Sequence, residues 1–184
     1  MKHLKNYKTL YFAIGSTFIF FLYLIFALVP VSSCFRLDIG SNSLGLSFSY
    51  TKDMVQSFFQ LRTQDQLICY SQFLQIWDVI LSLISTIMFG SWILYFFKKK
   101  RLFLIAPTIL GMIADWLENY IELLMIETYL NSSAISQILV SLGSRINSFK
   151  FVMIGLTYLI ILTGIMIALK IVLTNLVFRK KTPL

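Results

Sequence analysis

The chain has 184 residues, of which 58% are hydrophobic and only 13% are charged, and its formal net charge is +8. This length suits a single domain, but the composition is far from that of a water-soluble globular protein. The positive charge does not indicate nucleic-acid binding, because the basic residues gather at the ends of apolar segments, where anionic lipid headgroups explain them. The lipid bilayer is therefore the expected partner, and nucleic acid is not.

Four apolar segments are long enough to cross a bilayer, which takes about 20 helical residues. They cover about residues 9–31, 74–97, 102–130 and 146–169. The remainder is too short to fold as a separate soluble domain, so residues 1–184 are predicted to form one transmembrane domain. We expect an all-α fold, namely an integral membrane four-helix bundle with a short amphipathic helix in its outer loop.

Basic residues are distributed unevenly between the two ends of these spans. One end has ten basic residues and no acidic ones: Lys2, Lys5, Lys8, Lys98, Lys99, Lys100, Arg101, Arg179, Lys180 and Lys181. The loops at the other end carry Arg36, Lys52, Arg62 and Arg145 against Asp38, Asp53 and Asp65. By the positive-inside rule, we expect a multi-pass protein of the bacterial inner (plasma) membrane with both termini in the cytoplasm.

The outer loop, residues 32–73, is the largest segment outside the spans. Its first part is rich in Ser, Gly and Asn, which predicts irregular turns. Thr51 then resembles an N-cap, and an amphipathic pattern follows over about residues 51–61. We expect this helix to lie on the membrane surface or across the bundle mouth, with Phe58 and Phe59 turned toward lipid or the bundle.

Both cysteines, Cys34 and Cys69, lie in the outer loop near the ends of the first two spans. In an oxidising compartment a disulfide could tie these ends together, and two free cysteines are the alternative. Thr63 and Gln66 have the spacing of a capping box, which predicts a helix that runs unbroken into the second span.

Three acidic residues, Asp115, Glu118 and Glu122, form a stripe along the third span, and Asn119 lies beside Glu118. An ionised carboxylate in hydrocarbon is costly, so such residues normally face a bundle interior or a water-filled cavity. The stripe can serve structural adhesion between helices or chemistry. For chemistry, Asp115 and Glu118 are the catalytic candidates, and they would also be the ligands of a hard cation if a metal is bound.

Depth can be counted from the basic anchors at about 1.5 Å per helical residue. Asp78, Glu122 and Lys150 then fall at one level, roughly 30 Å from the cytoplasmic edge. Glu118 and Asp115 lie deeper on the same face, which predicts a polar funnel that opens outward and closes on Asp115. The expected ligand-binding residues share this funnel: Asn119, Glu122, Asp78, Lys150, Tyr23 and Tyr158.

Lys150 is the one base in the outer half of any span, and leaving it unpaired there would be costly. It is predicted to neutralise Glu122 or Asp78. Asp115 is predicted to be further from Lys150 and more desolvated, which makes it the expected proton-transfer residue. Deeper in the third span, Pro107 can kink the helix, and Gly111 allows a neighbouring helix to approach closely.

Several kinds of chemistry are excluded by residues that the sequence lacks. The single histidine, His3, lies far from the stripe, which argues against a histidine-rich zinc site and a Ser-His-Asp triad. Neither Gly-rich phosphate-binding motif occurs. No cofactor can be assigned.

The chain resembles a family of small bacterial four-span integral membrane proteins of unassigned function. The resemblance rests on Ser49-Tyr50, Pro107, Gly111 and the motif D-x-x-E-N in Asp115-Trp116-Leu117-Glu118-Asn119, and it extends from about Phe35 to Leu169. It implies the topology and the position of the site, and no particular activity.

Three hypotheses for function follow. In the first, an outward-facing acidic cavity binds a small or lipidic ligand or a cation, with acid–base catalysis there. In the second, a small transporter or accessory subunit uses the carboxylates for proton or cation coupling. In the third, the chain is a structural partner of another membrane protein, and the stripe packs against that protein.

Overall fold

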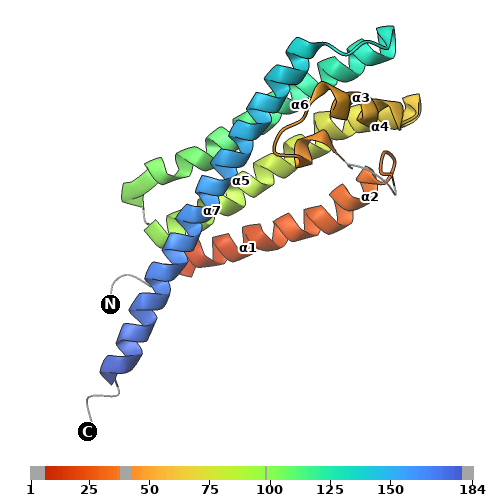
Figure 1. Cartoon of the computed structure of the whole chain (residues 1–184). Coiled ribbons are helices and arrows are strands. Elements are labelled where there is room, and N and C mark those ends of the chain that lie inside the picture. Colours follow the sequence, from red (N-terminus) through yellow and green to blue (C-terminus); the bar gives the residue numbers. More distant parts are fainter. Residues whose placement is uncertain (1–6, 38–42, 98, 180–184) are drawn as a thin grey trace.

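The structure is a computed structural model that describes residues 7–37, 43–97 and 99–179, and all regular elements within these ranges are helices (Figure 1). Four continuous helical runs are long and apolar enough to cross a membrane: Tyr7–Ser32, Gln64–Phe97, Leu102–Ser132 and Gln137–Thr174. This confirms the predicted all-α bundle. The predicted charge positions 2, 5, 38, 98, 180 and 181 lie outside the described residues.

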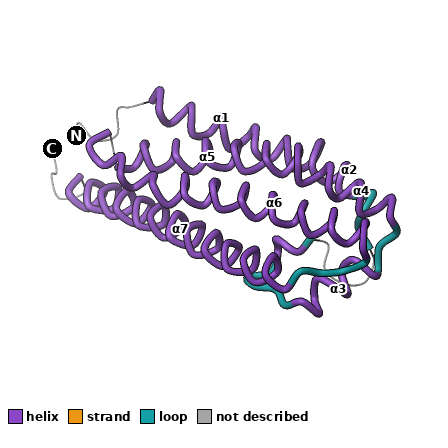
Figure 2. The backbone as a smooth tube through the Cα atoms, turned by 90° about the horizontal axis from the view of Figure 1, so that it is seen from above, coloured by secondary structure: helices purple, strands orange, loops and turns teal. Residues whose placement is uncertain are grey.

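The first span consists of α1 (Tyr7–Tyr23), a π-helical turn η1 (Leu24–Leu28) and α2 (Val29–Ser32). It packs along α5 of the second span at one side of the bundle (Figure 2). The hydroxyls of Ser16 and Ser91 lie 3.0 Å apart and join the two helices. Most large side chains of this span are exposed, as expected for a helix that faces lipid.

The second span is one continuous run of α4 (Gln64–Gln72), the π-helical η3 (Phe73–Asp78) and α5 (Val79–Phe97). Thr63 and Gln66 form the predicted capping box, with each side chain accepting from the other residue's backbone N–H. The helix therefore begins ten residues before the predicted apolar span that starts at residue 74, because its first turns are stabilised by the cap rather than by lipid.

The third span begins with a 3₁₀ segment η4 (Lys99–Ile105), followed by α6 (Ala106–Ser132), and the fourth is the long helix α7 (Gln137–Arg179). The two lie side by side in both views and make the most extensive helix contact of the bundle (Figures 1 and 2). Pro107 lies in the first turn of α6, where a missing N–H leaves no hydrogen bond unmade. It therefore starts the helix instead of kinking it within the span.

Two glycines let helices approach closely, as the sequence predicted for Gly111. A Cβ atom on Gly111 would lie 3.5 Å from the Cβ of Met153 on α7, so the α6 and α7 backbones are near each other there. On α7, a Cβ on Gly164 would lie 2.6 Å from Cγ of Phe96 on α5. Any larger side chain at Gly164 would separate these two helices.

The second outer loop is much shorter than predicted, because α6 ends at Ser132 and α7 already begins at Gln137. The turn between them is closed by Ser133, whose φ of 52° is left-handed and whose N–H bonds the Tyr129 carbonyl at 2.7 Å. The polar residues that were predicted to be loop thus form the first turns of α7, where they contact the outer loop.

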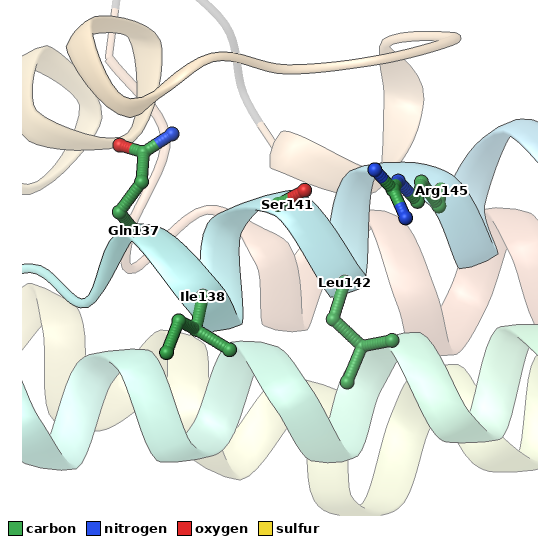
Figure 3. A pocket seen from close by; sticks show the side chains of 5 residues that line it. All are labelled: Gln137, Ile138, Ser141, Leu142 and Arg145. Carbon is green, nitrogen blue, oxygen red and sulfur yellow. The ribbon is translucent and has the colours of Figure 1, made fainter.

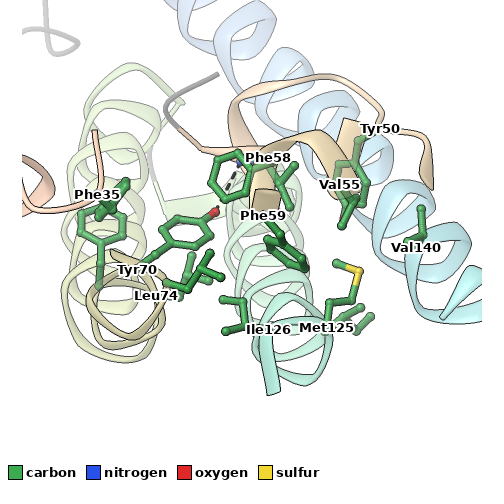
Figure 4. Close-up of a cluster of buried hydrophobic side chains, with 14 residues drawn as sticks. Phe35, Tyr50, Val55, Phe58, Phe59, Tyr70, Leu74, Met125, Ile126 and Val140 are labelled. Carbon is green, nitrogen blue, oxygen red and sulfur yellow. Dashed lines mark hydrogen bonds between the residues drawn. The ribbon is translucent and has the colours of Figure 1, made fainter. Parts of the chain in front are cut away.

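The outer end of the bundle is covered by residues 43–50, here called the strap, and by α3 (Lys52–Gln60). Thr51 caps α3 by accepting from the Met54 N–H, as predicted. Phe58 and Phe59 are buried against the bundle. They belong to the main apolar cluster of the described chain (Figure 4), formed by Phe35, Leu44, Tyr50, Val55, Phe58, Phe59, Leu67, Tyr70, Phe73, Leu74, Ile121, Met125, Ile126 and Val140.

The outer end is also fastened covalently. Cys34 and Cys69 form a disulfide with their Cα atoms 6.4 Å apart, which decides between the two alternatives that the sequence left open. Near it, the Arg62 guanidinium donates to the Phe35 and Phe58 carbonyls at 3.0 and 2.9 Å. Burial lowers the pKa of Arg62 from its ordinary value. The loop between the first two spans is therefore an ordered, disulfide-linked cap over this end of the bundle.

Candidate functional site

The acidic stripe lies toward the end of the bundle that the strap covers. α6 carries all three residues, and both Glu118 and Glu122 are completely buried. The Asp115 side chain, one turn deeper, is 16% exposed. Asp115 is thus less enclosed than its neighbours, contrary to the prediction that it would be the most desolvated.

Lys150 of α7 is the centre of the site. Its ammonium lies 3.2 Å from Oδ1 of Asp115, forms an ion pair with Glu118, and donates to the Gly45 carbonyl at 3.2 Å. The predicted pairing with Glu122 or Asp78 is therefore wrong. A physical reason is the 3₁₀ segment η4, which rises about 0.5 Å more per residue than an α-helix and places the stripe further out than counted.

Glu122 has a neutral partner instead. The Tyr70 hydroxyl of α4 donates to Oε2 of Glu122 and lies 3.0 Å from the Ser43 hydroxyl at the start of the strap. Tyr70 is fully buried. No sequence pattern indicated this role for Tyr70, because a single tyrosine in a mainly apolar segment resembles a packing residue.

Asp78 is bound to the third span through Asn119, whose amide donates to Oδ2 of Asp78 at 2.9 Å and to the Leu74 carbonyl at 3.4 Å. The Tyr23 hydroxyl donates to the Trp77 carbonyl at 2.8 Å. Both carbonyls belong to the π-helical η3, and π-turns of this kind are frequent at functional sites. The π-turn was not predicted, since no sequence pattern marks it.

The deep end of the site is polar on both sides of Asp115. The Trp116 indole donates to the Ser82 hydroxyl at 2.6 Å, and Ser82 also interacts with the Asp115 carboxylate. One turn or two further in, the hydroxyls of Thr108 and Thr157 lie 3.2 Å apart between α6 and α7. Thr108 lies in the first turn of α6, so polar contacts between α6 and α7 extend from the stripe to the start of that helix.

The strap covers the outward end of this polar region. Besides the Lys150 contact with Gly45, three side chains of α7 hold the strap backbone. Ser148 donates to the Phe48 carbonyl at 3.0 Å, Asn147 donates to the Ser47 carbonyl, and Ser144 accepts from the Tyr50 N–H at 3.0 Å. The predicted funnel is therefore closed at its outward end, because an irregular loop folds back over it.

Four buried side-chain oxygens in the described part of the chain lack a hydrogen-bond partner, and three of them belong to the stripe or to a residue that interacts with it. They are Oε1 of Glu118, Oε1 of Glu122, the Tyr50 hydroxyl and Oδ1 of Asn147. Such orphans are rare in folded proteins. Burial, and then the charges of Glu122 and Glu118, raise the pKa of Tyr50 above its ordinary value, so its hydroxyl stays neutral.

Not every predicted residue joins this network. Tyr158 is 56% exposed, and its ring packs edge-on against Phe89. The structure thus brings together Asp115, Glu118 and Lys150, with Glu122, Asp78, Asn119 and Tyr23 around them, and leaves Tyr158 outside. Among the described residues, no group of three or more His, Cys, Asp or Glu side chains is arranged to hold a metal ion.

Two hollows on the outer surface are separate from the stripe. One, of about 380 Å³, lies beside the start of α7, where Ile138 and Leu142 point toward α6 and Arg145 points away from it (Figure 3). The other, of about 300 Å³, is lined by residues that include Gln75 and Glu127. Neither includes a residue of the stripe, so neither is the predicted acidic cavity.

Compared with protein-family models, curated proteins and solved structures, the chain matches none. Its chemistry must be read from the site itself. Four buried or part-buried carboxyl groups, those of Asp78, Asp115, Glu118 and Glu122, face the single ammonium of Lys150. Since unpaired charge is costly in this setting, the surplus carboxyl groups must carry protons or meet a cationic or hydrogen-bonding group.

Proposed function

We propose that this chain is a bacterial plasma-membrane protein that binds a membrane-soluble ligand at Asp115 and performs acid–base chemistry there. The ligand would carry an amino or hydroxyl group, which is what a carboxylate can bind. The observation that carries this proposal is the surplus of carboxyl groups over the one ammonium of Lys150. We also propose that the chain is related to the small bacterial four-span proteins that carry a D-x-x-E-N motif.

The route to the site supports a lipidic ligand. The strap covers the outward end, and Glu118 is fully buried, whereas Asp115 keeps 16% of its side chain exposed. Asp115 lies well inside the span, so a ligand would reach it through the lipid rather than from water. Trp116 follows Asp115 in the sequence, is 38% exposed and is hydrogen-bonded to Ser82. Its apolar ring would lie beside a ligand that approaches Asp115 from the lipid.

The neighbours of Asp115 suit acid–base chemistry. Lys150 contacts both Asp115 and Glu118, so a proton moved onto or off one carboxylate changes the charge felt by the other. Catalytic acids and bases are found where burial and charged neighbours act together. Asp115 is the residue that would contact the ligand, and Glu118 and Lys150 would set its charge.

The orientation is part of the proposal. The basic excess at one end supports cytoplasmic termini, and the Cys34–Cys69 disulfide lies at the opposite end, where an oxidising exterior would preserve it. Reporter fusions after Arg101 and Leu184 should report cytoplasm, and one near Gly45 should report the exterior. A cytoplasmic signal near Gly45 would overturn this orientation.

The ligand is tested by native mass spectrometry of protein purified in mild detergent. Wild-type protein should retain a bound molecule that Asp115→Asn loses while it keeps its thermal stability. Glu127→Gln is the matched control, because Glu127 is an exposed carboxylate on the same helix. Equal retention by wild type and Asp115→Asn, or no bound molecule and no effect of added lipids on stability, would contradict the proposal.

A second candidate, proton coupling, is favoured by a nearly continuous chain of polar contacts. It runs from Asp115 through Lys150 to Glu118, on to the adjacent Glu122, and through Tyr70 to Ser43 at the strap. Such a chain can relay protons between the bundle interior and its outer end. Proton flux into liposomes that falls in Glu122→Gln would support it, and flux equal to that of empty liposomes would exclude it.

A further inference from the structure

Three of the four orphan oxygens, those of Glu118, Glu122 and Tyr50, belong to groups that interact with one another between α6 and the strap. Glu118 and Glu122 are one helical turn apart, and their carboxyl groups lie within hydrogen-bonding reach of each other. The Tyr50 hydroxyl interacts with both carboxyl groups, although it makes no hydrogen bond. Its ring lies against Gly143 of α7, where any Cβ atom would collide with the hydroxyl. Asn147 is one turn further along the same helix.

The other polar atoms of Glu118, Glu122 and Asn147 already have hydrogen-bond or ion-pair partners, so only the four orphan oxygens lack one. Oε2 of Glu118 is held by Lys150, and Oε2 of Glu122 accepts from Tyr70. The Asn147 amide nitrogen donates to the strap. Each group therefore presents one free oxygen, and all of these oxygens can accept. The neutral Tyr50 hydroxyl brings one donor to this buried group, which leaves most of the acceptors unsatisfied, and a positive charge placed among them would satisfy these acceptors.

We propose that Glu118, Glu122 and Tyr50 bind one exchangeable monovalent cation, a proton or a sodium ion, beneath the strap. The shared chemistry is a single positive charge held by carboxylate oxygens, with the tyrosine hydroxyl as a neutral ligand. This site rests on the proposed function, because it shares Glu118 with the ligand site, but it uses Oε1 of that carboxylate, whereas Lys150 binds Oε2.

Occupancy would stabilise the closed strap. Gly45 of the strap lies against both Glu118 and Lys150, since a Cβ atom there would be 3.4 Å from Oε1 of Glu118 and 3.4 Å from Nζ of Lys150. An empty site leaves two carboxylates facing each other under the strap, and their repulsion opposes closure. A bound cation removes this repulsion, so the folded state takes up the ion more tightly than the unfolded chain, and stability rises with its concentration.

Any pH response must be assigned among several neighbours. The titratable and charged groups that face Glu118 and Glu122 are Tyr70 on α4, Asp78 on η3, Asp115 on α6, Tyr50 on the strap and Lys150 on α7. The response that belongs to the cation site is therefore the part that wild-type protein has and Glu122→Gln lacks, because Gln is a neutral isostere that needs no cation.

The experiment measures Tm in detergent from acid to alkaline pH, in sodium chloride and in choline chloride of the same ionic strength. Wild type should lose stability toward alkaline pH in choline. If sodium is an occupant, sodium chloride restores the Tm; if only protons bind, it does not. Glu122→Gln should lack this component, and the control Glu127→Gln should keep it. Wild-type protein that responds to neither ion, or Glu122→Gln that responds like wild type, would overturn the site.

A second variant covers the case in which Glu122→Gln does not fold. Tyr50→Phe removes one oxygen without removing charge, so the sodium concentration or proton activity needed for half the effect should rise. An unchanged midpoint would also overturn the site. If the cation response fails while Asp115→Asn still loses its bound ligand, only this inference falls and the proposed function stands.

Discussion

Removing the ammonium of Lys150 is the most informative single perturbation of this bundle. Lys150→Met keeps a long unbranched side chain but leaves Asp115, Glu118 and the Gly45 carbonyl without their shared donor. Removing one partner of a buried ion pair costs about 3–5 kcal/mol, because the other charge stays buried without compensation. Unfolding of the purified protein by denaturant in detergent should show a loss of that size at neutral pH.

Two further variants separate the charge effect from general damage. Glu118→Gln in the Lys150→Met background removes the fully buried one of the two orphaned carboxylates and should recover a large part of the lost stability. Lys170→Met is the matched control, since Lys170 is an exposed lysine on the same helix, and it should change little. A loss below about 1 kcal/mol for Lys150→Met, as for an exposed ion pair, or no recovery in the double variant, would refute the reasoning.

Three other predictions concern the outer cap. Replacing Cys34 and Cys69 by serine should lower the free energy of unfolding by about 2–4 kcal/mol, measured by denaturant titration against the oxidised protein. Gly143→Ala should cost about 1–3 kcal/mol by displacing the Tyr50 ring, whereas Gly155→Ala, with no atom within 4 Å, should be tolerated. Burial and then the neighbouring carboxyl charges raise the pKa of Tyr50 above 10.0. The free energy of unfolding that its neutral hydroxyl contributes is therefore complete below about pH 10 and declines above it. Tyr50→Phe should lack this decline.

The fold could be predicted because its determinants are local. Long apolar runs define the spans, and the caps at Thr51 and Thr63 mark the helix starts that the structure shows. The start of the fourth helix was predicted too late in the chain. The polar residues after Gln137 form helix while their side chains hydrogen-bond the strap, and no local sequence pattern reveals those contacts. Pro107 was expected to lie inside a helix and kink it. Because the preceding 3₁₀ segment ends at Ile105, α6 begins at Ala106 and Pro107 lies in its first turn.

The site was only partly predictable, because depth along a helix does not determine which side chains meet. Burial of Glu118 and Glu122 followed from the cost of charge in lipid, but the partner of Lys150 depended on the 3₁₀ rise of η4. Tyr70 was missed because its hydroxyl contacts Glu122 and Ser43, which are 52 and 27 residues away in the sequence. The strap was missed for the same reason, since all its anchors on α7 are remote in sequence.

The central claim is that carboxyl groups outnumber their positive partners inside the membrane part of the bundle, so that at least one is protonated at neutral pH. Infrared spectroscopy of the protein in lipid tests this directly through the C=O stretch of protonated carboxyl groups. The structure predicts such a band at neutral pH in sodium-free choline chloride, with a component that disappears in Glu122→Gln and remains in Glu127→Gln. A wild-type spectrum with carboxylate bands alone would contradict the claim.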